Sequence, residues 1–365
     1  MSVFSIAVDL GGTNLRIAAV SSEGRMLEKV TTGTEVQLGR DHVIQEMCEA
    51  IQSLTTKHRS AGDLAGIGIG VPGFIDMDTG TIMRSPNLQD WAHFPVRQEI
   101  ERRLSTKVVL ENDANAAALG EKWLGAGRNT DHMAMYTLGT GVGGGIVLNG
   151  RLWHGMNGMA NELGHFNIES EGHPCGCGSR GCLEQYASAT AIVRMAHEEI
   201  DTGNAPDLAD FARGNVEFTS RGIYQLAIQG HPTAQKIYQR VGRALGIGIG
   251  SMINALNLPM YVIGGGVSSA WEAFAPAMFQ ELKVRSFIYS VTAPDRVEKG
   301  EKHTVVTIAL MGSDAGLYGA AGLPMLPPEP QPRRCAARRR HRDRRDWDSN
   351  AAVKRAEPVR DTAPL

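Results

Sequence analysis

The chain has 365 residues, of which 42% are hydrophobic and 21% charged, as in ordinary globular proteins large enough for two hydrophobic cores. No apolar run approaches the roughly 18 residues that cross a bilayer, which excludes a membrane-spanning protein. No secretory signal pattern follows Met1, so we expect a cytoplasmic protein.

The net charge of −2 conceals an uneven distribution of charge. Residues 327–365 are first rich in proline and then strongly basic around Arg338 to Arg345, with few aliphatic side chains to bury. Such a composition predicts a disordered tail. We interpret it as an extension without function or the product of a shifted reading frame, with a nucleic-acid-binding arm as the alternative. The rest of the chain is acidic, which argues against nucleic acid as its main partner.

The first half of the chain alternates apolar strands with helices. Strands are predicted over residues 4–8, 15–20, 26–30, 66–71 and 107–110, an amphipathic helix over 41–58, and a helix of small residues from Asn112 or Asp113 to about 124. Glycines at Gly11 and Gly12 separate the first two strands. The order of these elements predicts a complete α/β unit.

The second half begins in the same way. Strands are predicted over 133–138, 145–148, 151–153, 260–263 and 305–310, a glycine loop over 139–145, and helices over 188–200, 208–212, 222–229, 232–256, 271–283 and 313–323. In both halves a glycine loop carrying a threonine joins a pair of strands. We therefore predict a duplicated α/β core with two domains flanking a cleft, over residues 1–113, completed by the helix near 313–325, and 114–312.

A cluster of metal-binding side chains lies near the middle of the chain: His165, Cys175, Cys177 and Cys182. Three thiolates and one imidazole within 18 residues match a closed tetrahedral zinc shell, which predicts a structural ion that orders a loop over 165–182. Carboxylates at Glu162 and Glu184 bracket the cluster. A loop fixed by zinc would present them to the hydroxyls of a polar ligand.

Two other interpretations of the cysteines fit less well. A disulfide framework requires an oxidising compartment, for which the sequence gives no signal. A zinc ribbon usually has Cys-x-x-Cys pairs and several bases, whereas this cluster has Cys-x-Cys and only Arg180. Cys48 and Cys335 lie elsewhere and are interpreted as incidental thiols.

Three glycine-rich turns follow apolar strands and suit the binding of a polyphosphate, because glycine lets the backbone approach an anion closely. The candidate phosphate- and nucleotide-binding residues are Asp9, Gly11, Gly12, Thr13, Asn14, Thr140, Gly141, Gly264, Gly265 and Gly266. Asp9 would hold a hydrated Mg²⁺. No turn has the Gly-Lys-Ser/Thr ending of Walker A or opens a helix with GxGxxG, which argues against P-loop and NAD-binding proteins.

A polar motif, Glu111-Asn112-Asp113-Ala114-Asn115, follows the strand at 107–110. An isolated Asp at this place is most simply a helix cap. The alternative is a general base, because a carboxylate at a strand end beside a cleft is well placed to accept a proton from a hydroxyl.

Together these motifs resemble the ROK family of sugar kinases and repressors, over residues 3 to about 325. The matching segments are Asp9–Thr13, Glu111–Asn115, Gly139–Gly145, Glu162–His165 and Cys175–Glu184. The resemblance implies an actin-like, ribonuclease-H-like duplicated fold and a homodimer. It also implies ATP-dependent phosphorylation of the 6-hydroxyl of glucose, with ATP, Mg²⁺ and structural Zn²⁺ as cofactors, and with N-acetylmannosamine, N-acetylglucosamine or fructose as alternative substrates.

The resemblance also assigns roles to residues. Asp113 is the implied catalytic base, the four residues of the metal cluster are implied zinc ligands, and the implied sugar-binding residues are Asn87, Asn112, Asp113, Glu162, His165 and Glu184. Asn161 departs from the glycine that the family usually has before its Glu-Leu-Gly-His segment. The first strand begins too early for the DNA-binding helices of the family's repressors, and Asp113 and the glycine turns are retained. We therefore expect an enzyme, with a non-catalytic sugar sensor as the alternative.

Overall fold

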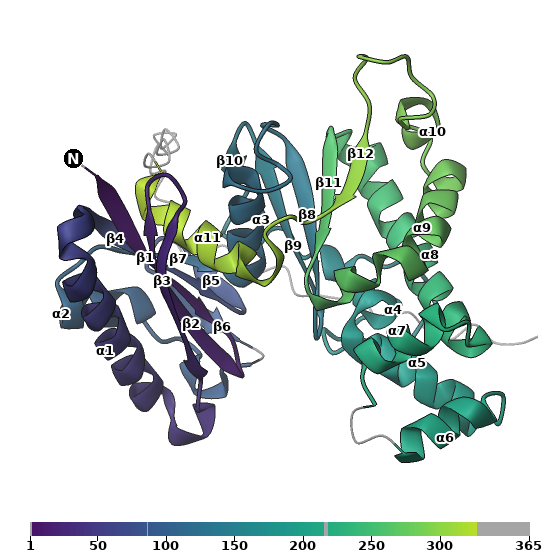
Figure 1. Ribbon diagram of the computed structural model, residues 1–365, viewed down its shortest axis with the longest axis horizontal. Helices are drawn as coiled ribbons and strands as arrows, with labels where there is room; N and C mark the ends of the chain where they lie inside the picture. The colour runs from purple at the N-terminus through teal and green to yellow at the C-terminus, as the bar shows by residue number, and fades with distance from the viewer. Residues whose placement is uncertain (1, 86, 215–217, 327–365) are drawn as a thin grey trace, which may run out of the picture. The chain divides into compact units, whose positions relative to one another are not determined.

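The fold is described from a computed structural model, for residues 2–85, 87–214 and 218–326. Its first sheet contains β1 (Val3–Leu10), β2 (Asn14–Ser21), β3 (Met26–Gly33), β4 (Asp63–Val71) and β7 (Val108–Asn112), in the order β3-β2-β1-β4-β7 (Figure 1). β1 pairs antiparallel with β2 and parallel with β4. The central strands are apolar on both faces because helices cover them, as parallel sheets require.

Two helices and a small hairpin complete this half. α1 (Arg40–His58) matches its predicted range, and α2 (Val96–Leu104) follows the hairpin of β5 (Phe74–Asp76) and β6 (Thr81–Arg84). The hairpin was not predicted from the sequence. Its strands are too short to show alternation, and its turn is held by the Asp76 carboxylate, which accepts hydrogen bonds from the backbone N–H groups of Asp78 and Thr79.

The second sheet repeats the first. β8 (Met133–Leu138), β9 (Val142–Leu148), β10 (Arg151–Leu152), β11 (Met260–Gly264) and β12 (Val305–Ile308) lie in the order β10-β9-β8-β11-β12. β8 pairs antiparallel with β9 and parallel with β11, as β1 does with β2 and β4. The same order and directions in both sheets confirm the predicted duplication.

Most predicted bounds in this half differ from the observed ones by at most two residues, but the glycine loop differs by more. The glycine loop expected over 139–145 ends at Gly141, because β9 begins at Val142 and pairs through Gly143 to Gly145 with β8. Glycine is needed in this strand because α3 (Asp113–Trp123) lies against it. A Cβ atom at Gly143 would come within 2.8 Å of the Ala114 Cβ, and one at Gly145 within 2.5 Å of the Ala118 Cβ.

Helices cover the second sheet. They are α4 (Glu184–Ala187), α5 (Ala189–Asp201), α6 (Pro206–Gly214), α7 (Ser220–Ile228), α8 (Pro232–Leu256), α9 (Trp271–Arg285) and α10 (Tyr289–Thr292). Buried side chains of α5, α7, α8 and α9 share one hydrophobic core with β8 and β11. None of the helices in the described ranges is long and apolar enough to cross a bilayer.

α3 and α11 (Ala315–Gly322) pack against each other, and each also packs against a sheet (Figure 1). α11 contacts β1 and β4 of the first sheet, while α3 contacts β8 and β9 of the second. Their backbones touch through small residues, since a Cβ at Gly319 would meet the Ala116 carbonyl oxygen at 1.6 Å and one at Gly120 the Ala315 carbonyl oxygen at 2.1 Å. The domain boundaries themselves stay a prediction.

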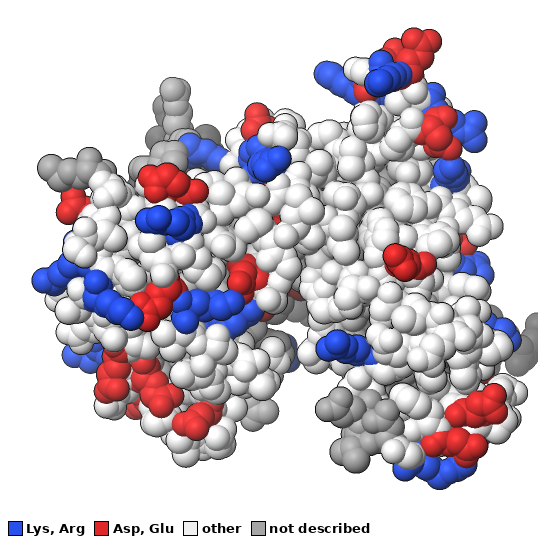
Figure 2. Space-filling model, viewed as in Figure 1, with Lys and Arg blue, Asp and Glu red and all other residues white. Residues whose placement is uncertain are grey.

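Charged side chains are interspersed on the face shown in Figure 2, where neither sign gathers into one large patch. Several form ion pairs, such as Lys29 with Asp314 and Lys57 with Glu28. The predicted basic tail, 327–365, lies outside the described residues.

We expect truncation after Leu326 to leave activity and melting temperature unchanged, because the tail has few apolar side chains with which to pack on the body. A truncation before Ala315, which also removes α11 and its buried Leu317, is the destabilising comparison. Thermal melting of the three chains provides the measurement. A melting temperature several degrees below that of the full chain, in the protein that ends at Leu326, would contradict the prediction.

Candidate functional site

Asp113 is the first residue of α3, but the helix is capped by its neighbour. The Asn112 Oδ1 atom accepts hydrogen bonds from the Ala114 and Asn115 N–H groups, at 2.9 and 3.2 Å. The helix does have a side-chain cap, but the cap is Asn112, so the interpretation of Asp113 as the cap is wrong. One Asp113 carboxylate oxygen accepts from the Ala114 N–H at 2.9 Å, which leaves the other oxygen for a different partner.

Electrostatics make Asp113 a suitable proton acceptor. Burial raises the pKa of its carboxyl group to about 6, with a further rise from the negative charge of Asp9 and a smaller one from Glu162. A carboxylate with a pKa near the operating pH is ionised at neutral pH and accepts a proton more readily than an ordinary one. Asp113 and Asp9 come from the first half of the chain, whereas Glu162 comes from the second, so the site combines both halves.

The turn between β1 and β2 is held in shape by its own backbone. The Gly11 N–H donates to the Asn14 carbonyl oxygen at 2.9 Å, and the Thr34 hydroxyl donates to the Gly11 carbonyl oxygen at 2.7 Å. The Thr13 side chain is exposed. Gly12 approaches Asn87, because a Cβ at Gly12 would lie 3.1 Å from the Asn87 Cβ. This turn and the predicted sugar-binding Asn87 are thus neighbours.

Asp9, the predicted ligand of a hydrated Mg²⁺, already has a charged partner in the protein. Its carboxylate forms an ion pair with Arg16, and its side chain is largely buried. Burial raises the Asp9 pKa, although the Arg16 charge opposes that rise. A hydrated Mg²⁺ at Asp9 would therefore share the carboxylate with a guanidinium group.

The second turn, between β8 and β9, is tied to the metal-binding loop. The Glu184 Oε2 atom accepts a hydrogen bond from the Val142 N–H at 3.0 Å. A Cβ at Gly141 would lie only 2.4 Å from that same oxygen, whereas nothing lies within 4 Å of a Cβ at Gly139. Thr140 is exposed between them. A side chain at position 141 would therefore clash with Glu184, whereas one at position 139 would point into open space.

The third glycine run has a mainly structural explanation. A Cβ at Gly265, whose φ is +84°, would meet backbone atoms of Leu138 at 2.4 Å, and one at Gly264 would meet the Met135 Cε at 2.6 Å. Gly266 alone faces open space. The contact of this run with a nucleotide stays a prediction.

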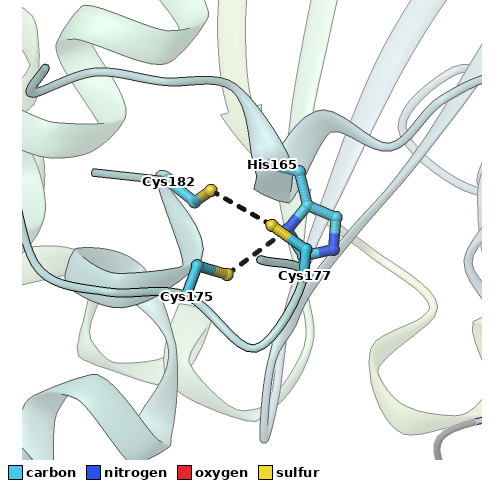
Figure 3. A group of neighbouring side chains, drawn as sticks. All are labelled: His165, Cys175, Cys177 and Cys182. Carbon is cyan, nitrogen blue, oxygen red and sulfur yellow. Dashed lines mark hydrogen bonds between the residues drawn. The ribbon is translucent and has the colours of Figure 1, made fainter. Parts of the chain in front are cut away.

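The four predicted metal ligands lie together (Figure 3). Their donor atoms are all within 4.8 Å of one another. The Cys177 and Cys182 sulfur atoms are 3.7 Å apart, and the Cys175 sulfur is 3.7 Å from the His165 Nδ1. Two ligands at about 2.3 Å from a tetrahedral ion are separated by about 3.8 Å, so the spacing and the donor set both fit zinc. All four cysteines of the described residues are free thiols, which excludes a disulfide within the cluster.

The two flanking carboxylates lie next to this cluster. His165 has its Nδ1 among the sulfur atoms and its Nε2 3.8 Å from the Glu162 carboxylate. The Glu184 Oε1 lies 3.9 Å from the Cys175 sulfur. Burial raises the Glu162 pKa, and the nearby Glu184 charge adds to this, while His165 opposes it. The Glu162 and Glu184 carboxylates and the His165 Nε2 therefore provide several hydrogen-bonding groups near one another, as a ligand with several hydroxyls requires.

A further set of polar residues is connected by hydrogen bonds next to Asn112 and Glu162, and the sequence did not identify it as a set: Glu111, Asn115, His154 and Asn161. The Glu111 carboxylate accepts from the Asn112 N–H and the Asn115 side chain, and lies 2.7 Å from the His154 Nε2. Asn161 donates to Asn115 at 2.8 Å. Glu111 is conspicuous in the sequence as a charge at an apolar strand end, but no local pattern distinguishes His154.

Comparison with known proteins gives consistent matches over nearly the whole described chain. A model described as the ROK family matches residues 5–325. A glucokinase of Halalkalibacterium halodurans is 39% identical over 321 residues, covering 87% of this chain and 94% of its own. A glucokinase of Thermotoga maritima is 40% identical over 320 residues, covering 87% and 96%. A solved ROK family glucokinase from Streptomyces griseus, in complex with glucose and AMPPNP, has a TM-score of 0.71 and 34% identity, covering 88% and 98%.

Proposed function

The chain belongs to the ROK family, and from that premise we propose that it is an enzyme that transfers the γ-phosphoryl group of ATP to the 6-hydroxyl of glucose. The observation that carries the proposal is Asp113, a carboxyl group with a pKa of about 6 that is raised in part by the charge of Glu162, one of the carboxylates that flank the metal cluster. A sugar hydroxyl between these groups would have both a proton acceptor and hydrogen-bond partners to orient it.

In the proposed reaction, the Asp113 oxygen that is not hydrogen-bonded to Ala114 takes the proton of the 6-hydroxyl as the hydroxyl oxygen attacks the γ-phosphorus, and the bond from that phosphorus to the β,γ-bridging oxygen breaks to release ADP. Glu162, Glu184 and the His165 Nε2 bind the other hydroxyls of the sugar, with Asn87 and Asn112 contributing from the first half. The backbone N–H groups of the two turns stabilise charge on the transferred phosphoryl group. Asp9 would be the nearby ligand for Mg²⁺ on a nucleotide bound by these turns, where the ion would offset phosphate charge.

The Cys₃His shell is proposed to hold zinc. When bound, zinc would fix the His165 ring through its Nδ1, and the Nε2 would remain free to bond a sugar hydroxyl. The short distances between Glu184, Cys175 and the Val142 N–H support a loop that binds sugar on one side and borders a phosphate turn on the other.

A panel of hexoses tests the substrate. Purified protein is incubated with ATP, Mg²⁺ and each of glucose, N-acetylmannosamine, N-acetylglucosamine and fructose, and the position of the phosphate is read by ³¹P NMR. We expect the highest kcat/KM with glucose and the phosphate on its 6-oxygen. Turnover of another sugar with none of glucose would overturn the assignment, and no turnover of any sugar would favour a sugar sensor.

Substitutions at Gly139 and Gly141, on either side of Thr140, should distinguish effects on sugar binding from effects on nucleotide binding. Gly141→Ala places a methyl group 2.4 Å from the Glu184 oxygen, so we expect it to raise the KM for glucose roughly 10-fold or more, because Glu184 must move. Gly139→Ala meets nothing within 4 Å in the protein, so its effect should fall on the KM for ATP, whose phosphates would fill that space. Steady-state kinetics with each substrate varied provide the measurement. Equal effects on both substrates in both variants would contradict this division of roles.

A further inference from the structure

A buried polar network connects the catalytic end of α3 to the segment that carries Glu162. Glu111 is 2% exposed and Asn115 is 1% exposed, yet both side chains are polar. A buried carboxylate is stable only when donors surround it. Glu111 has three partners: the Asn112 N–H at 2.9 Å, the Asn115 side-chain amide at 3.0 Å and the His154 Nε2 at 2.7 Å.

The network continues through Asn161. Its side-chain amide donates to the Asn115 Oδ1 at 2.8 Å and to the Trp153 carbonyl oxygen at 2.7 Å, which ties together both ends of the segment 153–161. Its φ is +74°, in the left-handed region that asparagine tolerates better than most residues. Asn161 therefore combines a backbone conformation suited to glycine with a bridge that glycine cannot make.

The two ends of the network belong to different segments of the chain. Glu111 and Asn115 flank Asp113 at the junction of β7 and α3, whereas His154 and Asn161 bracket a loop that follows β10 and ends beside Glu162. The only covalent path between these segments runs through β8, β9 and β10. The hydrogen bonds are thus a direct connection between the segment bearing the base and the segment bearing a sugar-binding carboxylate.

We propose that Glu111, Asn115, His154 and Asn161 are positioning residues that set the location of Asp113 relative to Glu162. None of them is assigned contact with the substrates. Their effect on the reaction is to hold two groups from separate segments in the geometry that phosphoryl transfer requires, where errors of about 1 Å cost up to roughly 100-fold in rate. The inference rests on the proposed sugar phosphorylation at this site.

Substitutions at Asn161 separate the backbone from the side chain. Asn161→Gly keeps φ +74° accessible and removes the amide, so we expect kcat/KM for glucose to fall roughly 10-fold while the KM for ATP stays within about 2-fold. Asn161→Ala removes the same amide and adds backbone strain, so it should have a similar kinetic effect and a lower melting temperature. Asn149→Gly is the matched control, because Asn149 also has a positive φ, +54°, in the exposed turn after β9, and its kinetics should not change.

Substitutions at His154 test the other end. His154→Leu removes the donor to Glu111, and we expect a loss of kcat/KM for glucose of roughly 10- to 100-fold. His154→Gln retains a side-chain N–H and should recover activity to within about 5-fold of the wild type. The double variant His154→Leu with Asn161→Gly should lose less than the product of the single losses, because both act through Glu111 and Asn115.

The outcomes distinguish positioning from simple stability and from failure of the proposed function. Variants that melt at lower temperature but keep wild-type kcat/KM for glucose at 25 °C would overturn the inference. Phosphorylation of no sugar by the wild type would overturn the proposed function instead. Hydrogen exchange at the amides of residues 160–165 then tests the network by itself, with faster exchange expected in Asn161→Gly and unchanged exchange counting against the connection.

Discussion

Replacement of Asp113 by Asn is expected to lower kcat by roughly 100-fold or more while leaving glucose binding nearly intact, because the amide retains the shape of the carboxyl group but cannot accept the proton. The Asn side chain can still accept the hydrogen bond that Ala114 donates. Single-turnover kinetics together with a glucose titration separate the two effects. Near-normal kcat in this variant would remove Asp113 from the mechanism.

Asp41→Asn is the matched control. Asp41 stands in the first turn of α1 as Asp113 does in that of α3, but it is exposed and far from the site in the sequence. A change that acts only through the start of a helix would affect both variants, whereas loss of the base affects Asp113 alone. We expect kcat of Asp41→Asn to equal that of the wild type.

The raised pKa of Asp113 predicts two dependences on pH. The base must be ionised, so kcat/KM should fall about tenfold per pH unit below pH 6. The folded state binds the proton more tightly than the unfolded state, whose pKa is near 3.8, so this group makes the protein less stable as pH rises from about 4 to 6. Asp113→Asn should therefore be more stable than the wild type at pH 7.5, by on the order of 3 kcal/mol, and no more stable at pH 4.

Loss of the metal is expected to affect the sugar far more than the nucleotide. Cys177→Ser, or removal of zinc by a chelator, should raise the KM for glucose roughly 10- to 100-fold and change the KM for ATP little, because the shell orders the segment that carries Glu162, His165 and Glu184. The fold should persist, since each sheet has its own hydrophobic core. Melting curves, metal content and kinetics together provide the measurement.

Cys48→Ser is the control for this prediction. Cys48 is also a free thiol, but it is buried in α1, within the core of the first half, whereas Cys177 is exposed. Its replacement should leave metal content at about one zinc per chain and the KM for glucose unchanged. Wild-type protein that contains no metal and retains full affinity for glucose would overturn both the zinc assignment and the double role of His165.

The sequence was sufficient for the parts of the structure that depend on local patterns. Apolar strands such as 133–138 and the long helix 232–256 were predicted with their observed bounds, because periodicity over many residues is a strong signal. The metal ligands were predicted as a set, since four donors close in sequence needed no knowledge of the tertiary fold. The repeated strand order then followed from the repeated glycine turns.

Features that depend on contacts between distant segments could not be predicted in this way. Gly143 and Gly145 suggested a loop, but they belong to a strand whose glycines make room for α3. Asn112 and Asp113 are adjacent candidates for one cap, and only the backbone geometry decides between them. The pairing of Glu111 with His154 spans 43 residues and leaves no periodic signal.

The hydrogen bond from Val142 to Glu184 has a thermodynamic consequence for the two substrates. One carboxylate borders both the turn proposed for the phosphates and the loop proposed for the sugar. If glucose draws this carboxylate toward a hydroxyl, the N–H group that it releases becomes available to a phosphate oxygen, so each ligand strengthens the other. Reciprocity then requires the factor by which glucose tightens nucleotide binding to equal the factor by which nucleotide tightens glucose binding, so a change at Glu184 that weakens one effect must weaken the other equally.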